Sequence, residues 1–284
     1  METKRILVAT ELDELSDKVT EFAISVAKQL NTSEIVLLNV IKPVHSQTFS
    51  ATGDAMLSDG QSIDRFNAQL MRKHQTLVEN AANKFSTDKV KIKPYVRFND
   101  SKTDLNGYIE YFDAGLVLFG SRDEDNFLNQ IFGIDSEKIV RKVDYPVIIL
   151  KEETNCSMIR DILVAIDVNE KDQGGLNDIA QFADLSESRM HLLHVVINGE
   201  TSPDESIEKL NMLAKEFELS NYTINVVNNN NLEDGIKGFV RKNNPDMIAV
   251  QSQGKGKIRK LIFGSSTQGI IKEVDKPVFV SMIS

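Results

Sequence analysis

The sequence predicts an α/β protein in which two tandem copies of one domain each form a parallel sheet flanked by helices. Short β-branched runs alternate along the chain with longer stretches of helical period, which is typical of repeated strand–helix units. The chain also repeats itself, because residues 5–11 (Arg-Ile-Leu-Val-Ala-Thr-Glu) match residues 161–167 (Asp-Ile-Leu-Val-Ala-Ile-Asp). A chain of 284 residues has room for two domains of ordinary size.

The repeat extends through both copies and sets their boundaries. Two further pairs of segments match, namely residues 37–41 with 192–196 and residues 142–149 with 273–280. We therefore expect domains at 1–151 and 159–284. The polar stretch from Ile149 to Met158 should be the linker between them.

Five strands are expected in each copy, each a short run of aliphatic and β-branched residues. In the first copy they span Ile6–Thr10, Ile35–Val40, Val90–Arg97, Leu116–Gly120 and Val147–Leu150. In the second copy they span Ile162–Ile166, Leu192–Val196, Tyr222–Val227, Met247–Gln251 and Val278–Ser281. Helices should connect them, because the stretches between have helical period.

The helix after the first strand has the clearest pattern. Its apolar residues recur at spacings of three and four and should face the sheet: Val19, Phe22, Ala23, Val26, Ala27 and Leu30. The first copy is also longer than the second, by an insertion of small polar residues at 42–61. We expect this insertion to be a surface loop that leads into a long helix from about Ser62 to Phe85.

Composition excludes several classes of protein. The chain is 41% hydrophobic and 26% charged, which suits a globular core and excludes disorder. Its net charge of −9 opposes binding to nucleic acid and to anionic membranes. There is no membrane-spanning apolar run and no signal-peptide pattern at the start, so we expect a cytoplasmic protein.

Cysteine and histidine give no sign of a metal or redox site. Cys156 is the only cysteine and has no histidine beside it, so neither a disulfide nor a redox function is expected. The four histidines show no ligand spacing, and His194 should be a structural residue near a strand end. The run Asn228 to Asn231 should form a solvated turn.

The sequence carries no recognisable catalytic motif. The segment Gly-Ser-Ser-Thr-Gln-Gly at 264–269 begins like a phosphate-binding P-loop, but Ile270 stands where the lysine must be. The same segment is no nucleophile elbow, because Gln268 takes the place of its second glycine. We therefore expect no dedicated enzyme.

A glycine-rich loop after the fourth strand of the second copy suits a polyanion. Gly254 and Gly256 let backbone N–H groups approach a ligand closely, and Gly264, Ser265 and Ser266 offer amides and hydroxyls at a helix start. Four positive charges lie between them: Lys255, Lys257, Arg259 and Lys260. The alternative is that a serine only caps the helix and that the lysines belong to a solvated turn.

Taken together, the tandem halves, the opening Ile-Leu-Val-Ala, the Pro-Val that closes each half and this glycine loop resemble the universal stress protein family. Nucleotide-binding members carry Gly, two residues, Gly, nine residues, then Gly followed by Ser or Thr. In the second copy this motif falls on Gln251, Gly254, Gly264 and Ser265, so only the first glycine is replaced.

The first copy departs further from the motif. The same register gives Gly120, Asp123, Gly133 and Ile134, and Asp123 would set a carboxylate against phosphate. Glu11 also replaces the acid that follows the first strand. The resemblance therefore implies a degenerate first site and a nearly complete second one.

The resemblance further implies doubly wound sheets of strand order 3-2-1-4-5, whose ligands bind beyond the carboxyl ends of strands one and four. It implies ATP or another adenine nucleotide as the ligand, with Mg²⁺ as an optional companion, and any ATP hydrolysis would be slow and incidental. The implied binding residues are Ala165, Ile166, Asp167, Val195, Val250, Gln253, Gly254, Gly264, Ser265, Ser266 and Thr267.

Three functions remain open at this point. The first is a stress-response protein that binds adenine nucleotide in its second domain and acts as a regulator or interaction module. The second is an interaction protein without nucleotide, which pairs with itself or with a client. The third is an adenylating enzyme, for which only the insertion at 42–61 could supply a second pocket.

The last strands of the two copies should join the domains. Each is an apolar run after proline, and an exposed apolar edge strand aggregates unless it is covered. We expect these two edges to pair antiparallel as an internal pseudo-dimer, with Val147 and Phe279 at the interface.

Overall fold

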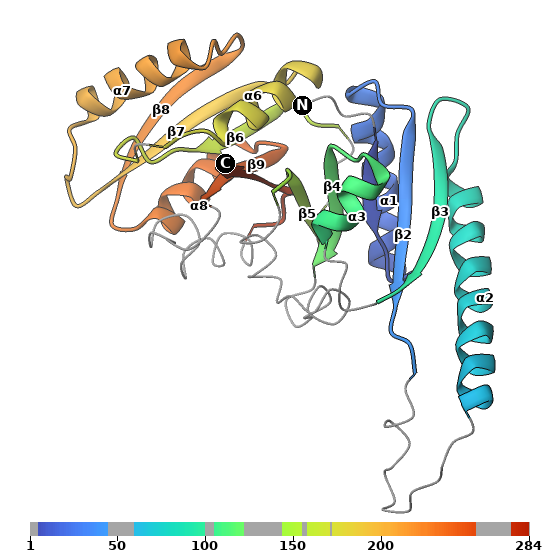
Figure 1. The fold of residues 1–284 in the computed structure, drawn as a ribbon. Coiled ribbons are helices and arrows are strands. Elements are labelled where there is room, and N and C mark those ends of the chain that lie inside the picture. Colours follow the sequence, from blue (N-terminus) through green and yellow to red (C-terminus); the bar gives the residue numbers. More distant parts are fainter. Residues whose placement is uncertain are drawn as a thin grey trace, which may run out of the picture.

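The computed structural model describes residues 5–44, 60–99, 105–121, 144–154, 158–170, 172–253 and 274–283. The loop expected over most of the insertion, Cys156, and the expected last helix of each copy lie outside these residues. Within them the chain is an α/β protein with one continuous sheet (Figure 1).

Ten strands form the sheet, and all ten match the expected strands to within a few residues. They are β1 (Ile6–Ala9), β2 (Glu34–Ile41), β3 (Lys91–Phe98), β4 (Leu116–Ser121), β5 (Val147–Lys151), β6 (Asp161–Ala165), β7 (Arg189–Ile197), β8 (Tyr222–Asn229), β9 (Met247–Gln253) and β10 (Val278–Ile283). Their spatial order is β3-β2-β1-β4-β5-β10-β9-β6-β7-β8. Each half therefore has the order 3-2-1-4-5.

Helices cover both faces of the sheet. Those in the described residues are α1 (Glu14–Gln29), α2 (Gly60–Phe85), α3 (Leu105–Phe112), α6 (Leu176–Leu185), α7 (Pro203–Glu216) and α8 (Leu232–Asn243). Residues of α1, α2, α6 and α7 pack on one face, and residues of α3 and α8 pack on the other. The six residues of the predicted α1 stripe are all buried, and the long helix expected after the insertion is α2.

The two halves join where β5 pairs with β10. This pairing is antiparallel, whereas the other strand pairs are parallel, and it sets Phe279 opposite Ile148 and Val280 opposite Val147. The expected pairing of the last strands is thereby confirmed. It removes one exposed edge from each half, and edges of this kind are the sites where sheets aggregate.

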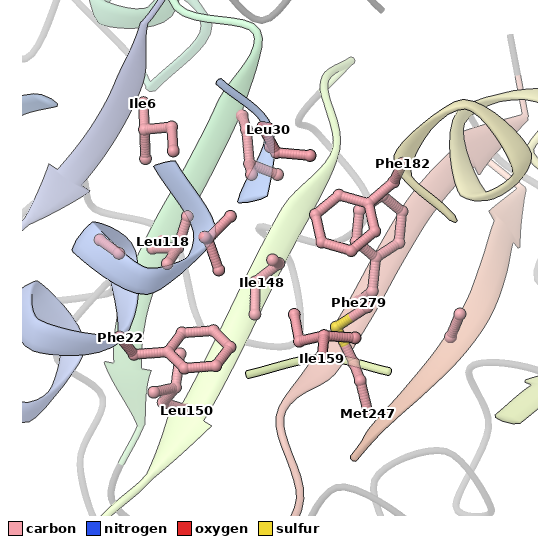
Figure 2. Close-up of a cluster of buried hydrophobic side chains, with 14 of the residues drawn as sticks. Ile6, Phe22, Leu30, Leu118, Ile148, Leu150, Ile159, Phe182, Met247 and Phe279 are labelled. Atoms are coloured by element: carbon pink, nitrogen blue, oxygen red, sulfur yellow. The ribbon is translucent and has the colours of Figure 1, made fainter. Parts of the chain in front are cut away.

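The core is also shared by the two halves. On the face that α1 and α6 cover, one cluster of buried side chains runs from Phe22 and Leu118 of the first half to Phe182 and Phe279 of the second (Figure 2). The rings of Phe182 and Phe279 lie 5.1 Å apart between centroids. Burial of this apolar surface therefore depends on both halves being present.

A glutamine at the end of α1 links the halves by hydrogen bonds. Gln29 Nε2 donates to the carbonyl oxygen of Ile159 at 2.7 Å, and Gln29 Oε1 accepts from the N–H of Ile159 at 3.0 Å. Ile159 stands just before β6 and is itself buried. One side chain of the first half thus satisfies both backbone groups of a residue in the second.

Two local expectations were wrong. The linker does not begin at Ile149, because Ile149 and Leu150 lie in β5, as the expected strand Val147–Leu150 had placed them, and buried Lys151 ends that strand. The asparagine run is not a single turn either. Asn228 and Asn229 extend β8, and Asn231 caps α8 by accepting from the N–H of Asp234 at 2.8 Å.

Each half fixes the amino ends of its first two strands with an ion pair, but the signs are exchanged. In the first half Arg5, beside β1, pairs with Glu34 of β2. In the second half Asp161 of β6 pairs with Arg189 of β7, at 2.7 Å from Nη2. His191 also contacts Asp161, with 3.1 Å between Nε2 and Oδ1.

We expect Phe279→Ala to lower the free energy of unfolding by about 3–5 kcal/mol, because it leaves a cavity in the core that both halves share. Phe66→Ala is the control, because Phe66 is 48% exposed on α2. Urea unfolding followed by circular dichroism measures both. Equal costs for the two variants would contradict a core that spans the halves.

Acid should weaken the second half through Asp161. Partial burial alone would raise the pKa of Asp161, but its hydrogen bonds from Arg189 and His191 outweigh burial and hold that pKa below its ordinary value of 3.8. The ionised carboxylate therefore stabilises the fold above that value, and the contribution is lost as the pH falls through the lower folded pKa.

The measurement compares wild type with Asp161→Asn in urea at a series of pH values. The difference between their free energies of unfolding should be full above about pH 5 and should shrink below pH 3.8. Glu205→Gln, at an exposed pair on α7, is the control and should show little difference. A gap for Asp161→Asn that does not vary with pH would refute this account.

Candidate functional site

The carboxyl ends of β6 and β9 meet in the middle of the second half. β6 pairs with β7 on one side and with β9 on the other, and all three strands are parallel. Val164 of β6 lies opposite Ala249 of β9, so the residues that follow each strand reach the same edge of the sheet. This is where the strand order reverses, and ligands of doubly wound sheets bind at that crevice.

Backbone and side-chain hydrogen bonds hold the loop that follows β6. The N–H of Ile166 donates to the carbonyl of Leu193 at 2.9 Å. The carbonyl of Ile166 accepts from His194 Nδ1 at 3.0 Å, so Nδ1 carries the proton. His194 is 6% exposed, and its expected structural role is confirmed.

Asp167 comes next and is half-buried. Its carboxylate accepts a hydrogen bond from the N–H of Asn169 at 3.0 Å, which folds the loop back on itself. Its carbonyl oxygen accepts from Gln173 Nε2 at 2.8 Å. These hydrogen bonds tie the backbone of residues 166–169 to β7 and to Gln173.

A pair of buried glutamines connects this loop to the end of β9. Gln173 Nε2 donates both of its hydrogens, to the carbonyls of Asp167 and Glu170. Its Oε1 therefore faces the other way and accepts from Gln251 Nε2 at 2.7 Å. We call these two side chains the glutamine bridge.

The bridge leaves one acceptor without a partner. Because Gln173 is fixed by two carbonyls, Gln251 must direct its own Nε2 toward Gln173. Gln251 Oε1 is buried and has no hydrogen-bond donor in the described part of the chain. A buried acceptor of this kind favours a donor such as a hydroxyl, an amine or a water molecule.

The two halves fill the space beside the fourth strand in opposite ways. In the first half Gly120 of β4 is covered by Leu15 of α1, and a Cβ on Gly120 would lie 2.5 Å from Leu15 Cγ. In the second half the large residue is Gln251 of β9 and the small one is Gly175, just before α6. A Cβ on Gly175 would lie 3.2 Å from Gln251 Oε1. Both sites are tightly packed, but only the second presents an amide.

The loop after β1 in the first half also differs from its counterpart. Asn39 of β2 takes the place of His194 and donates from Nδ2 to the carbonyl of Thr10 at 2.7 Å. Asn39 Oδ1 also accepts a hydrogen bond from Nδ1 of His74, a residue of α2, at 2.8 Å. Burial and the charge of Lys73 hold the pKa of His74 below 6.5. Glu11, in the place of Asp167, is exposed.

The structure places part of the expected nucleotide site. Ala165 ends β6, Ile166 and Asp167 follow it, and the strand β9 includes buried Val250 and ends at Gln253. Val195 is buried, with its side chain directed at Gly235 of α8. The remaining residues lie outside the described ranges: Gly254, Gly264, Ser265, Ser266 and Thr267.

Gln173 was not foreseen from the sequence. A single glutamine in a polar loop gives no pattern to recognise, and its role depends on Gln251, which is far away in sequence. Across the described ranges no group of three His, Cys, Asp or Glu side chains could hold a metal ion. The same residues include no helix long and apolar enough to span a bilayer.

Comparison with known proteins agrees with the repeat. The model of the universal stress protein family matches residues 2–151 and again residues 158–281. Universal stress protein Slr1230 of Synechocystis is 23% identical over 97% of this chain and 98% of its own length. Universal stress protein G of Salmonella typhimurium is 28% identical over 49% of this chain and 90% of its own length.

A solved structure supports the same fold. The crystal structure of a universal stress protein from Archaeoglobus fulgidus matches this chain with a TM-score of 0.63 and 21% identity. The match covers 99% of this chain and 96% of the Archaeoglobus chain. With two family matches that together span most of its length, the chain belongs to the universal stress protein family and carries one family domain in each half.

Proposed function

We propose that this protein binds one adenine nucleotide, in its C-terminal half, and that the bound nucleotide regulates its interactions. The observation that carries the proposal is the position of the motif. Gly254 is the next residue after β9, and Gly264 and Ser265 come later in the same segment of sequence. The glutamine bridge joins the carboxyl end of β9 to the Asp167 loop. The family's phosphate-binding residues thus start at the crevice where a doubly wound sheet receives its ligand.

The chemistry of the crevice suits the two ends of a nucleotide differently. The unpartnered Gln251 Oε1 favours a hydroxyl donor, as on a ribose, and disfavours phosphate, whose oxygens are acceptors too. The N–H groups and hydroxyls of Gly264, Ser265 and Ser266 suit phosphate instead. We assign the nucleoside to the side of Ala165, Ile166 and Asp167, and any Mg²⁺ would accompany the phosphates.

The first half is poorly suited to a nucleotide, which supports one site per chain. Leu15 covers Gly120 at the first position of the motif, and the sequence sets Asp123 and Ile134 at later ones. An apolar side chain and a carboxylate are poor partners for a polyphosphate. The described crevice of the second half contains no paired nucleophile and base, so we propose binding rather than catalysis.

Titration of the full chain with ATP should give one site per chain. Gly264→Asp should abolish binding, because it sets a negative charge against phosphate at the expected helix start. The matched control is Gly133→Asp, at the same motif position of the first half, which should bind as wild type does. Isothermal titration calorimetry measures all three proteins.

Two equal sites would contradict the asymmetry. No heat with ATP, ADP, AMP or adenosine would favour the alternative, an interaction protein that uses no nucleotide.

Gln251→Gly restores the glycine of the family motif and should shift the preference toward phosphate. We expect the affinity for ATP to rise by roughly tenfold relative to that for adenosine, because the variant removes a buried acceptor and lets the backbone approach phosphate. Its free energy of unfolding should fall by about 1–3 kcal/mol, because Gln173 loses its partner. An unchanged ratio of the two affinities would show that Gln251 does not contact the ligand.

A further inference from the structure

The two outer edges of the sheet are built differently. β3 and β8 are the terminal strands, and each pairs with only one described strand. β3 carries the charged residues Lys91, Lys93 and Arg97, together with Pro94. Charges and proline on an edge strand prevent it from pairing with another chain. β8 reads Tyr-Thr-Ile-Asn-Val-Val-Asn-Asn, with neither a charge nor a proline.

The strand registers allow the two edges to be compared position by position. Pro94 lies opposite Leu37 of β2, and Ile224 lies opposite Leu192 of β7. Leu37 and Leu192 are equivalent in the repeat, so Ile224 matches Pro94. Proline within a sheet occupies an edge position whose N–H would face away from the neighbouring strand. The N–H of Ile224 therefore faces outward.

β8 also keeps apolar surface that β3 has buried. The long helix α2, of 26 residues, covers β3 and leaves Ile92 6% and Val96 3% exposed. The helix over β8 is α7, of only 14 residues. Ile224 and Val226 pack against the core but are only half-buried, and no residue of β8 is fully buried.

We propose that β8 is the interface through which two copies of this chain form a dimer, by antiparallel pairing of β8 with β8. The molecule already uses this device once, where β5 and β10 join its two halves. The lack of charge matters for a second copy, since chains of net charge −9 repel each other wherever their charges meet. Pairing through β8 requires no bound nucleotide.

The side-chain pattern selects the register. In an antiparallel pair, residues directly opposite each other lie on the same face of the sheet. Ile224 and Val226 share the α7 face with the core cluster, and Val227 lies on the other face. A two-fold axis at Asn225 sets Ile224 opposite Val226 of the partner, so two pairs of β-branched residues meet across the axis.

The first experiment measures the mass of the full chain by sedimentation equilibrium. Wild type should associate to twice the chain mass of 31.8 kDa. Val227 of β8 is equivalent to Arg97 of β3 in the repeat. Val227→Arg therefore gives β8 a charge that β3 carries, and it should weaken association by about tenfold or more. Tyr111→Arg adds the same charge at a residue of α3 that is 69% exposed, and it should dimerise as wild type does.

A wild-type chain that stays monomeric, including one that pairs only with another protein, would overturn the proposal. So would a dimer that Val227→Arg leaves intact, or one that Tyr111→Arg disrupts equally. Circular dichroism reports whether each variant is folded.

The second experiment tests the register without adding charge, in a Cys156→Ser background that has no other cysteine. Asn225→Cys should form a disulfide-linked dimer on mild oxidation, because two opposite residues at the axis lie within disulfide range. Val227→Cys is the control, since the register sets it opposite Thr223 of the partner and far from its own copy. Equal cross-linking of both variants, or none with Asn225→Cys, would contradict the pairing.

Discussion

The structure depends on the antiparallel pairing of β5 with β10. Each half is a doubly wound sheet whose last strand would be an exposed apolar edge, and each edge covers the other. The pairing also brings the two cores into contact, so that Phe22 and Leu118 belong to one buried cluster with Phe182 and Phe279. The pairing joins the sheets of the two domains into one continuous sheet.

Within this shared frame, equivalent positions have exchanged their chemistry. The ion pair at the amino ends of the first two strands has opposite signs in the two halves, as Arg5 with Glu34 and as Asp161 with Arg189. The contact beside the fourth strand also differs: Gly120 packs against Leu15, whereas the equivalent Gln251 packs against Gly175. Such paired changes preserve packing and charge balance. The two halves therefore keep the same fold while the side chains beside their strands differ. Among the described residues the amide bridge occurs in the second half, at the end of the strand that precedes the glycine motif in the sequence.

The sequence was enough to predict the strands and their pairing between halves, because the repeat and the apolar runs are strong local signals. It misplaced the start of the linker, since Lys151 is polar yet buried at the end of β5. It also missed Gln173, whose role arises from a contact with Gln251 and from two backbone carbonyls. Contacts between residues distant in sequence are set by tertiary packing, and a single sequence does not display them.

The most direct test of the central claim, that one crevice of the two binds nucleotide, is hydrogen exchange of the full chain with and without ATP. Exchange slows where backbone amides become ordered or covered. A single site in the second half predicts slower exchange for residues 165–167 and 250–267 on adding ATP, and no change at residues 9–11 and 118–134. Equal protection of both crevices, or protection confined to the first half, would contradict it.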